Sequence, residues 1–208
     1  MTETPFEFWE TRYSTGSRET SGNPSAVLAD LAADRKPGRA LELGCGKGDD
    51  TVWLAKRGWQ VTAVDLSHAA LDIVSANAIA AGVGDRVRTE RHDLSESFPE
   101  GQFDLVLAMF LETPFEDFPR QAVVRRAAQA VTPGGMLLLV THGSAPPWRN
   151  GPKGPQHNFP SLETRVAELA ADPADWTEIR VADVGRTMTG PEGEVAEVLD
   201  RVIALERR

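Results

Sequence analysis

The chain has 208 residues, of which 41% are hydrophobic, and a formal net charge of −9 with a pI near 5.0. This length suffices for one sizeable core, and the acidic excess disfavours binding to a nucleic-acid backbone, which requires clustered Lys and Arg. No stretch approaches the roughly 18 apolar residues of a membrane span. We therefore predict one domain over residues 1–208, in a cytoplasmic protein without nucleic-acid or membrane partners.

The N-terminal part, residues 1–36, is predicted to form a lid followed by a helix. Its first stretch is polar and irregular around Trp9 and Tyr13. A helix is then predicted over residues 26–34, because Asn23-Pro24-Ser25 provides a typical helix start with proline near the first turn.

Strands and helices alternate strictly over residues 37–141. Apolar strands are predicted at 39–43, 59–65, 86–93, 103–110 and 136–142, with intervening helices at 49–58, 67–82 and 119–131. Such alternation is typical of a parallel sheet covered by helices on both faces, with ligands at the carboxyl ends of the strands. We predict an α/β fold with a doubly wound, seven-stranded, mainly parallel sheet.

The C-terminal part, residues 142–208, is predicted to lie on the substrate side. It begins with a Gly- and Pro-rich loop at 142–160, which is long for a compact domain and is therefore either functional or disordered. A helix follows at 161–172, a strand at 176–188, and a last strand or helix at 200–207.

A glycine-rich loop, ELGCGKGDD at residues 42–50, connects the first predicted strand to a helix. Its glycines permit positive φ angles and a close approach to a ligand, and the helix start offers free N–H donors. The phosphate-binding pattern GxxxxGK[ST] is absent, and the third glycine comes one residue too early for the dinucleotide motif GxGxxG. Asp49 and Asp50 would repel a diphosphate, so a ligand without phosphate is favoured. A turn that needs glycines for geometry alone is the alternative.

Two further acidic residues follow neighbouring strands. Asp65 ends the second predicted strand, where a carboxylate can accept both hydroxyls of a ribose, as NAD and S-adenosylmethionine both offer. Its alternative role is to cap the next helix. Asp93 follows the third strand and could accept a hydrogen bond from an adenine amino group.

In this order, the motifs resemble those of the class I S-adenosylmethionine-dependent methyltransferases. LELGCGKG resembles their first motif, an acidic residue followed by GxGxG, while VTAVDLS and HDL resemble the second and third. The match covers roughly residues 39–141. The run GKGDDTVWLAKRGWQVTAVDLSHAAL is also similar to small bacterial tellurite-resistance and thiopurine methyltransferases, which act on small molecules or soft atoms.

The resemblance implies S-adenosylmethionine as cofactor, with S-adenosylhomocysteine as product. It places Asp65 at the ribose, and Asp93 and Leu94 at the adenine. The full set of implied cofactor-binding residues is Glu42, Gly44, Cys45, Gly46, Gly48, Asp65, Leu66, Asp93, Leu94 and Met109. Cys45 is interpreted as a small packed side chain rather than a nucleophile, and no metal is expected, because HExxH and cysteine clusters are absent.

Methyl transfer is an in-line displacement that requires a positioned acceptor and, where the acceptor carries a proton, a general base. Candidate catalytic residues are His142 after the fifth strand, His157 in the long loop, and Tyr13. A loop histidine can equally be solvated or structural. Aromatic residues near the N-terminus and in the long loop are predicted to form a lid, although they could instead fill a hydrophobic seam: Trp9, Tyr13, Trp148 and Phe159.

The predicted function is methyl transfer to a small-molecule S, N or O acceptor, such as a thiol or chalcogen oxyanion, by a monomer or homodimer. Glu112 follows the fourth strand, close to where the acceptor would arrive. The motif [ND]PP[YF] of nucleic-acid amino-methyltransferases is absent there. The alternatives are an NAD-dependent oxidoreductase, disfavoured by the glycine spacing, and a non-catalytic protein that binds S-adenosylmethionine.

Overall fold

The computed structural model describes residues 3–149 and 159–208. Two short 3₁₀ turns, η1 (Gly84–Arg86) and η2 (Pro147–Arg149), accompany the main elements. The helices and strands follow in the order α1 (Pro5–Thr15), α2 (Ala26–Ala32), β1 (Arg39–Leu43), α3 (Asp49–Lys56), β2 (Gln60–Asp65), α4 (His68–Ala80), β3 (Val87–Arg91), β4 (Phe103–Met109), α5 (Arg120–Gln129), β5 (Val131–His142), α6 (Leu162–Leu169), β6 (Trp176–Thr189) and β7 (Val195–Arg207).

The described strands form one seven-stranded sheet in the order β3-β2-β1-β4-β5-β7-β6. Strands β1 to β5 are parallel, whereas β7 lies antiparallel between β5 and β6. The strand order reverses between β1 and β4, and ligands bind α/β sheets at the carboxyl ends beside such a switch point. The predicted seven-stranded, mainly parallel α/β fold is therefore confirmed.

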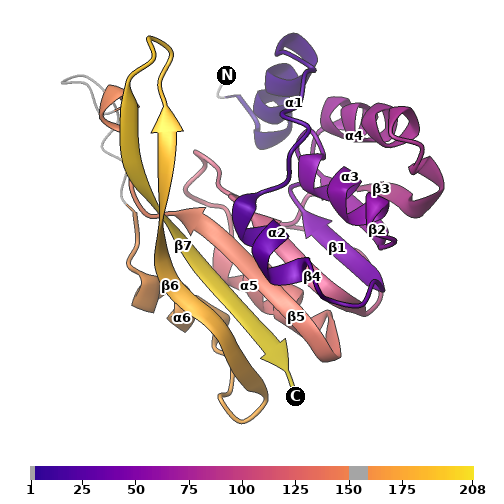
Figure 1. The fold of residues 1–208 in the computed structure, drawn as a ribbon, viewed down its shortest axis with the longest axis vertical. Coiled ribbons are helices and arrows are strands. Elements are labelled where there is room, and N and C mark those ends of the chain that lie inside the picture. The colour runs from indigo at the N-terminus through magenta and orange to yellow at the C-terminus, as the bar shows by residue number, and fades with distance from the viewer. Residues whose placement is uncertain (1–2, 150–158) are drawn as a thin grey trace.

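The core has two halves, one on each face of the sheet. Side chains alternate along each strand, so that Leu105 and Leu107 of β4 face one cluster while Val106 and Ala108 face the other. Helices α2, α3 and α4 cover the first face, and α5 and α6 cover the second (Figure 1). Burial on both faces explains why the central strands are almost continuously apolar.

The N-terminal segment is helical, and the prediction of an irregular stretch was wrong. Thr4 caps α1, because its hydroxyl accepts from the Glu7 amide at 3.2 Å while the Glu7 carboxylate accepts from the Thr4 amide at 2.9 Å. Pro5 occupies the first turn. This reciprocal cap was a usable sequence signal, but α1 has no buried residue and therefore only a weak apolar pattern.

The C-terminal region forms a long hairpin of β6 and β7. The last element is a strand, which settles the alternative left open by the sequence. Pairing runs from Trp176 opposite Arg207 to Thr189 opposite Val195, and the upper part of the hairpin rises beyond the rest of the sheet (Figure 1). Strand β5 begins at Val131, earlier than predicted, with a register shift opposite β4 that accommodates the Pro-Gly-Gly turn.

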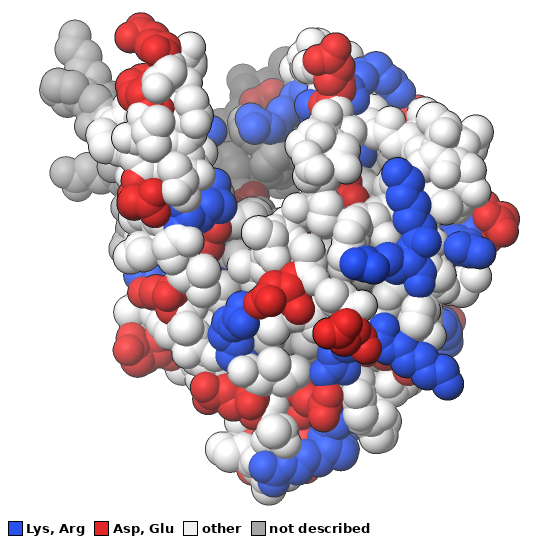
Figure 2. All heavy atoms as spheres, in the orientation of Figure 1, with Lys and Arg blue, Asp and Glu red and all other residues white. Residues whose placement is uncertain are grey.

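The surface carries mixed charge on the face shown in Figure 2, where Lys and Arg are interspersed with Asp and Glu. The upper part of this face is hollowed between the β6–β7 hairpin and the region of α1. Within the described residues, we find no helix with the length and apolar character needed to cross a membrane.

Candidate active site

The glycine-rich loop passes closely between β2, α4 and the segment after β4. The amides of Gly44 and Cys45 both donate to the Val64 carbonyl, at 2.8 and 2.9 Å. Gly44 and Gly48 have φ angles of +72° and +82°. A Cβ on Gly44 would lie 2.7 Å from Leu111, and one on Gly48 would lie 2.8 Å from Val74. Both glycines are therefore required for backbone conformation and for close packing.

Asp65 ends β2 and faces the loop. Its two carboxylate oxygens accept hydrogen bonds from the amides of Gly46 and Ser67, each at 3.0 Å. Burial raises the pKa of Asp65, and these backbone hydrogen bonds oppose the rise. Ser67 itself caps α4 by accepting from the Ala70 amide. Each Asp65 oxygen has a second lone pair that can accept from a ligand.

Glu42 and Cys45 are buried in and behind the loop. The Glu42 carboxylate accepts a hydrogen bond from the Thr51 hydroxyl of α3. Burial, together with the nearby charge of Asp50, raises the pKa of Glu42 well above its ordinary value. Burial also raises the pKa of the Cys45 thiol, which favours the neutral thiol of a packed side chain.

The two aspartates at the start of α3 hold the chain that precedes β1. Asp49 accepts from the amide and hydroxyl of Ser21 and from the Gly22 amide, at 2.9–3.2 Å. Asp50 accepts from the Ser25 amide at 2.6 Å, and burial raises its pKa to about 6. These hydrogen bonds hold residues 21–25 against the start of α3. This is a structural role in addition to the predicted repulsion of a diphosphate.

A cavity of about 320 Å³ opens at the carboxyl ends of the first four strands. Each strand contributes to its wall, and α1 contributes from the opposite side. The structure brings six of the predicted site residues together in this wall: Tyr13, Gly44, Asp65, Leu66, Asp93 and Leu94.

Helix α1 covers the glycine loop. A Cβ on Gly46 would lie 3.0 Å from the Tyr13 hydroxyl, and Trp9 stacks beside Tyr13 with ring centroids 6.2 Å apart. Glu10 fixes the helix to the start of α4 by accepting from the Ser67 hydroxyl at 2.8 Å. Burial and the Asp65 charge raise the pKa of Tyr13 to about 12, so at neutral pH its hydroxyl is a hydrogen-bond donor rather than a base.

The segment after β4 forms much of the cavity wall, and of its residues only Glu112 was indicated by the sequence. Met109, predicted at the cofactor, packs into the core, whereas the next residue, Phe110, lines the cavity. Phe110 has an unusual φ of +55° and donates its amide to the Val140 carbonyl at 2.8 Å. Leu111, Phe115 and other residues of this segment complete the wall. An aromatic residue beyond a strand carries no distinctive signal before the fold is known.

His142 lies behind this wall. Its ring stacks on Phe110 with centroids 4.5 Å apart, and its Nδ1 is 3.9 Å from an Asp200 oxygen. The backbone amide of His142 donates to Glu112 at 3.1 Å. Among the described residues, His142 and Trp148 do not line the cavity. His157 lies outside the described part of the chain.

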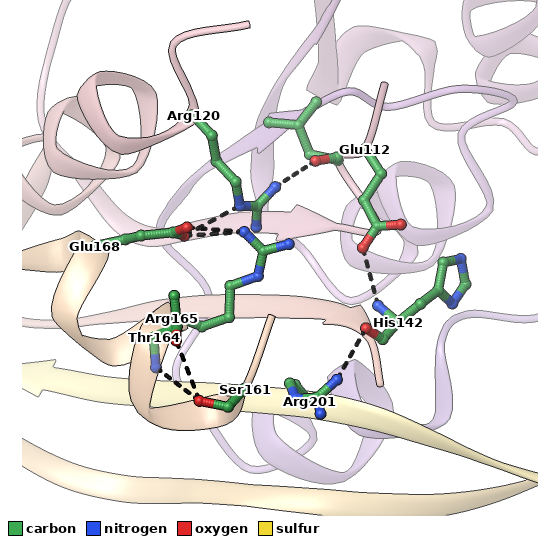
Figure 3. Close-up of polar contacts among 9 residues, drawn as sticks. Glu112, Arg120, His142, Ser161, Thr164, Arg165, Glu168 and Arg201 are labelled. Carbon is green, nitrogen blue, oxygen red and sulfur yellow. Dashed lines mark hydrogen bonds and ion pairs between the residues drawn. The ribbon is translucent and has the colours of Figure 1, made fainter. Parts of the chain in front are cut away.

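A second cavity of about 260 Å³ adjoins the first. The two share a wall formed by the segment after β4, including Glu112 and Phe118. Phe159, Arg120 and Arg165 line only the second cavity. Figure 3 shows the charged side chains that converge there.

Residues 40–135 match a family model described as a methyltransferase domain. The chain is 35% identical over 117 residues to ribosomal RNA small subunit methyltransferase C of Alcanivorax borkumensis, covering 53% of this chain and 34% of that protein. It is 34% identical over 114 residues to 27-O-demethylrifamycin SV methyltransferase of Amycolatopsis mediterranei, covering 54% and 41%. The chain thus spans between a third and just over two fifths of the length of these relatives.

Two solved structures share the fold over nearly the whole chain. One, from work on the conversion of a disulfide bond into a thioacetal group during echinomycin biosynthesis, has a TM-score of 0.73 at 24% identity, covering 97% of this chain and 92% of the other. TehB from Haemophilus influenzae has a TM-score of 0.71 at 15% identity, covering 96% and 67%.

The sheet order, the glycine loop and the acidic strand ends resemble those of the class I S-adenosylmethionine-dependent methyltransferases, and residues 40–135 match the methyltransferase-domain model. At 15% identity, the likeness to TehB concerns the fold alone.

Proposed function

We propose that this protein transfers a methyl group from S-adenosylmethionine to a sulfur, nitrogen or oxygen atom of a small molecule. The observation that carries the proposal is the 320 Å³ cavity, which brings Gly44, Asp65 and Asp93 together at the ends of three parallel strands. This arrangement suits an adenosyl group without phosphate, because carboxylates face the cavity.

The residues around the cavity fit such a cofactor in distinct ways. Asp65 would accept the ribose hydroxyls, while Asp93 and Leu94 would contact the adenine. Gly44, Gly46 and Gly48 allow the backbone to approach the ligand, and Glu42 and Cys45 support the loop from its buried side. Leu66 would contact the cofactor from the cavity wall, whereas Met109 would support the site from the core beneath it.

The chemistry requires little from the protein beyond positioning and exclusion of water. S-adenosylmethionine supplies an electrophilic methyl group. Trp9, Phe110 and Phe115 enclose the cavity, and the protonated Tyr13 hydroxyl can donate a hydrogen bond within it. Glu112, which lies in the wall shared by both cavities, is placed to take up an acceptor proton in preference to His142 behind Phe110.

Three observations support a small-molecule acceptor. The cavities are small, the net charge is −9, and one relative is named for a demethylrifamycin. Another relative is named for ribosomal RNA, and RNA is therefore the alternative acceptor. Clustered basic residues, which RNA binding requires, are not seen on the face in Figure 2.

Calorimetry with S-adenosylhomocysteine and with NADH tests the cofactor assignment. We expect binding of S-adenosylhomocysteine only. Asp65→Ala should weaken that binding by about 1–3 kcal/mol through lost charge-assisted hydrogen bonds. Asp85→Ala, at an exposed acid near the opposite end of β3, is the matched control. Binding of NADH alone, or an unchanged affinity in Asp65→Ala, would contradict the assignment.

A screen with labelled methyl donor tests the transfer itself. Thiols, phenols, amines and tellurite represent the acceptor classes, and we expect at least one class to be methylated. If every class, and RNA, remained unlabelled while S-adenosylhomocysteine bound, the alternative of a non-catalytic binding protein would be favoured.

A further inference from the structure

The second cavity contains a charged cluster, of which only Glu112 has a part in the methyl transfer proposed above. Arg120 begins α5, Arg165 and Glu168 lie on α6, and Glu112 comes from the segment after β4 (Figure 3). Arg165 Nη1 donates to both Glu168 oxygens, at 3.0 and 3.1 Å. Arg120 Nε lies 3.3 Å from the same carboxylate, and its Nη1 donates to the Leu111 carbonyl at 2.6 Å. Two guanidinium groups therefore share one carboxylate.

The two arginines retain unused donor capacity. Their side chains are only 17% and 11% exposed. A guanidinium group has five N–H donors, and the hydrogen bonds just described engage Nη1 of each. Nε of Arg165 is buried without a hydrogen-bond partner among the described residues, whereas Nε of Arg120 is buried in an ion pair with Glu168 at 3.3 Å that lacks hydrogen-bond geometry. Burial and the nearby Arg165 charge lower the pKa of Arg120, while the Glu168 and Glu112 carboxylates oppose this shift.

Glu112 limits how much negative charge the cavity can take. One of its oxygens already accepts from the His142 amide at 3.1 Å, and its carboxylate favours the charged form of Arg120. The two arginines and the two glutamates sum to zero formal charge, so a carboxylate would bind here through free guanidinium N–H donors rather than through excess positive charge, and a dianion would be repelled. Planar guanidinium groups match a carboxylate geometrically, and aromatic residues such as Phe115 and Phe118 line the remaining wall.

We propose that the methyl acceptor is a carboxylate-bearing small molecule whose carboxylate binds Arg165 and Arg120 in the second cavity. This inference rests on the proposed function, since it makes the first cavity the cofactor site. The wall shared by the two cavities, which includes Leu111 and Thr113, would let an acceptor extend from the arginines toward the cofactor. The competing explanation is that the cluster serves only to join α5 to α6.

Binding of benzoate to the protein saturated with S-adenosylhomocysteine separates these explanations, with methyl benzoate as an uncharged match. We expect benzoate to bind at least tenfold more tightly than methyl benzoate. Arg165→Gln should lower benzoate affinity about tenfold, while S-adenosylhomocysteine affinity stays within about twofold. Arg126→Gln, at an exposed arginine of α5, should change neither affinity.

Glu168→Gln provides a second test, in which benzoate affinity should rise rather than fall. Because it removes the carboxylate that competes for both arginines, it should tighten benzoate binding several-fold, which a purely structural role would not produce. Equal affinity for benzoate and its ester, or unaltered benzoate affinity in both Arg165→Gln and Glu168→Gln, overturns the proposal. Failure of S-adenosylhomocysteine to bind would instead overturn the proposed function.

Discussion

Two buried carboxyl groups and a half-buried one surround the glycine loop. Glu42 and Asp65 come from the ends of neighbouring strands, and Asp50 comes from the first turn of α3. Burial raises the pKa of all three. Such groups bind protons more tightly in the folded than in the unfolded state, so they link folding to pH around the cofactor cavity.

Glu42→Gln should flatten the pH dependence of folding. The folded pKa of Glu42 lies above its ordinary value of 4.5, so stability falls as pH rises from about 4.5 toward the folded pKa. Glutamine cannot ionise, yet its amide oxygen can still accept from Thr51. Urea unfolding at about pH 5 and about pH 8 should show that wild type loses stability relative to Glu42→Gln. The exposed Glu96→Gln is the control, and identical pH slopes would refute the prediction.

Helix α1 depends on few contacts for its position over the cavity. It has no buried residue and is held by Glu10, which accepts from Ser67 and Ala69, and by the edge contact of Phe8 with Phe115 at 5.7 Å. An element held this weakly can open locally at low free-energy cost. We therefore expect α1 to open locally when a ligand enters the cavity.

Glu10→Ala should loosen α1 without unfolding the protein. Loss of two hydrogen bonds to the start of α4 costs roughly 1–3 kcal/mol at this contact. We expect amide exchange over residues 5–15 to accelerate and affinity for S-adenosylhomocysteine to fall. Thr11→Ala, at an exposed position of the same helix, should have little effect. Unchanged exchange in Glu10→Ala would show that other contacts hold the helix.

The whole molecule extends beyond the segment that the family model matches. That match ends at residue 135, yet β7 inserts beside β5 and contributes buried side chains to both halves of the core, with Val202 and Ala204 in one half and Ile203 in the other. The C-terminal hairpin thus closes the sheet next to the last parallel strand. We expect it to unfold together with the cofactor-binding region.

Ile203→Ala tests that cooperativity. Ile203 is 3% exposed and pairs with Leu139 of β5, so truncation should cost about 2–4 kcal/mol and shift the single unfolding transition with an unchanged denaturant slope. Leu199→Ala, on the same strand but 43% exposed, should cost about 0.5 kcal/mol. Two separate transitions in Ile203→Ala would show that the hairpin is an independent unit.

Local pattern was enough to predict the cofactor side of the molecule. Gly44, Asp65 and Asp93 each follow a recognisable strand, and the carboxyl ends of parallel strands share one edge of the sheet. The sequence therefore predicted their neighbourhood, and the structure brings them into one cavity. Helix α1 was missed because its signal lay in the cap at Thr4 and not in an apolar face.

Apart from Glu112 and an aromatic residue of the long loop, the residues that line the second cavity, which we propose for the acceptor, were not predicted from the sequence. Arg120 and Arg165 are far apart in the chain and meet because α5 and α6 pack on the same face of the sheet. Phe110 lines the first cavity in place of Met109 because the backbone turns at the end of β4 to a φ of +55°. The sequence by itself determined the sheet and the glycine loop, since strand period and loop geometry are local. The packing of distant elements decides which side chains line the second cavity, and no local sequence pattern encodes that packing.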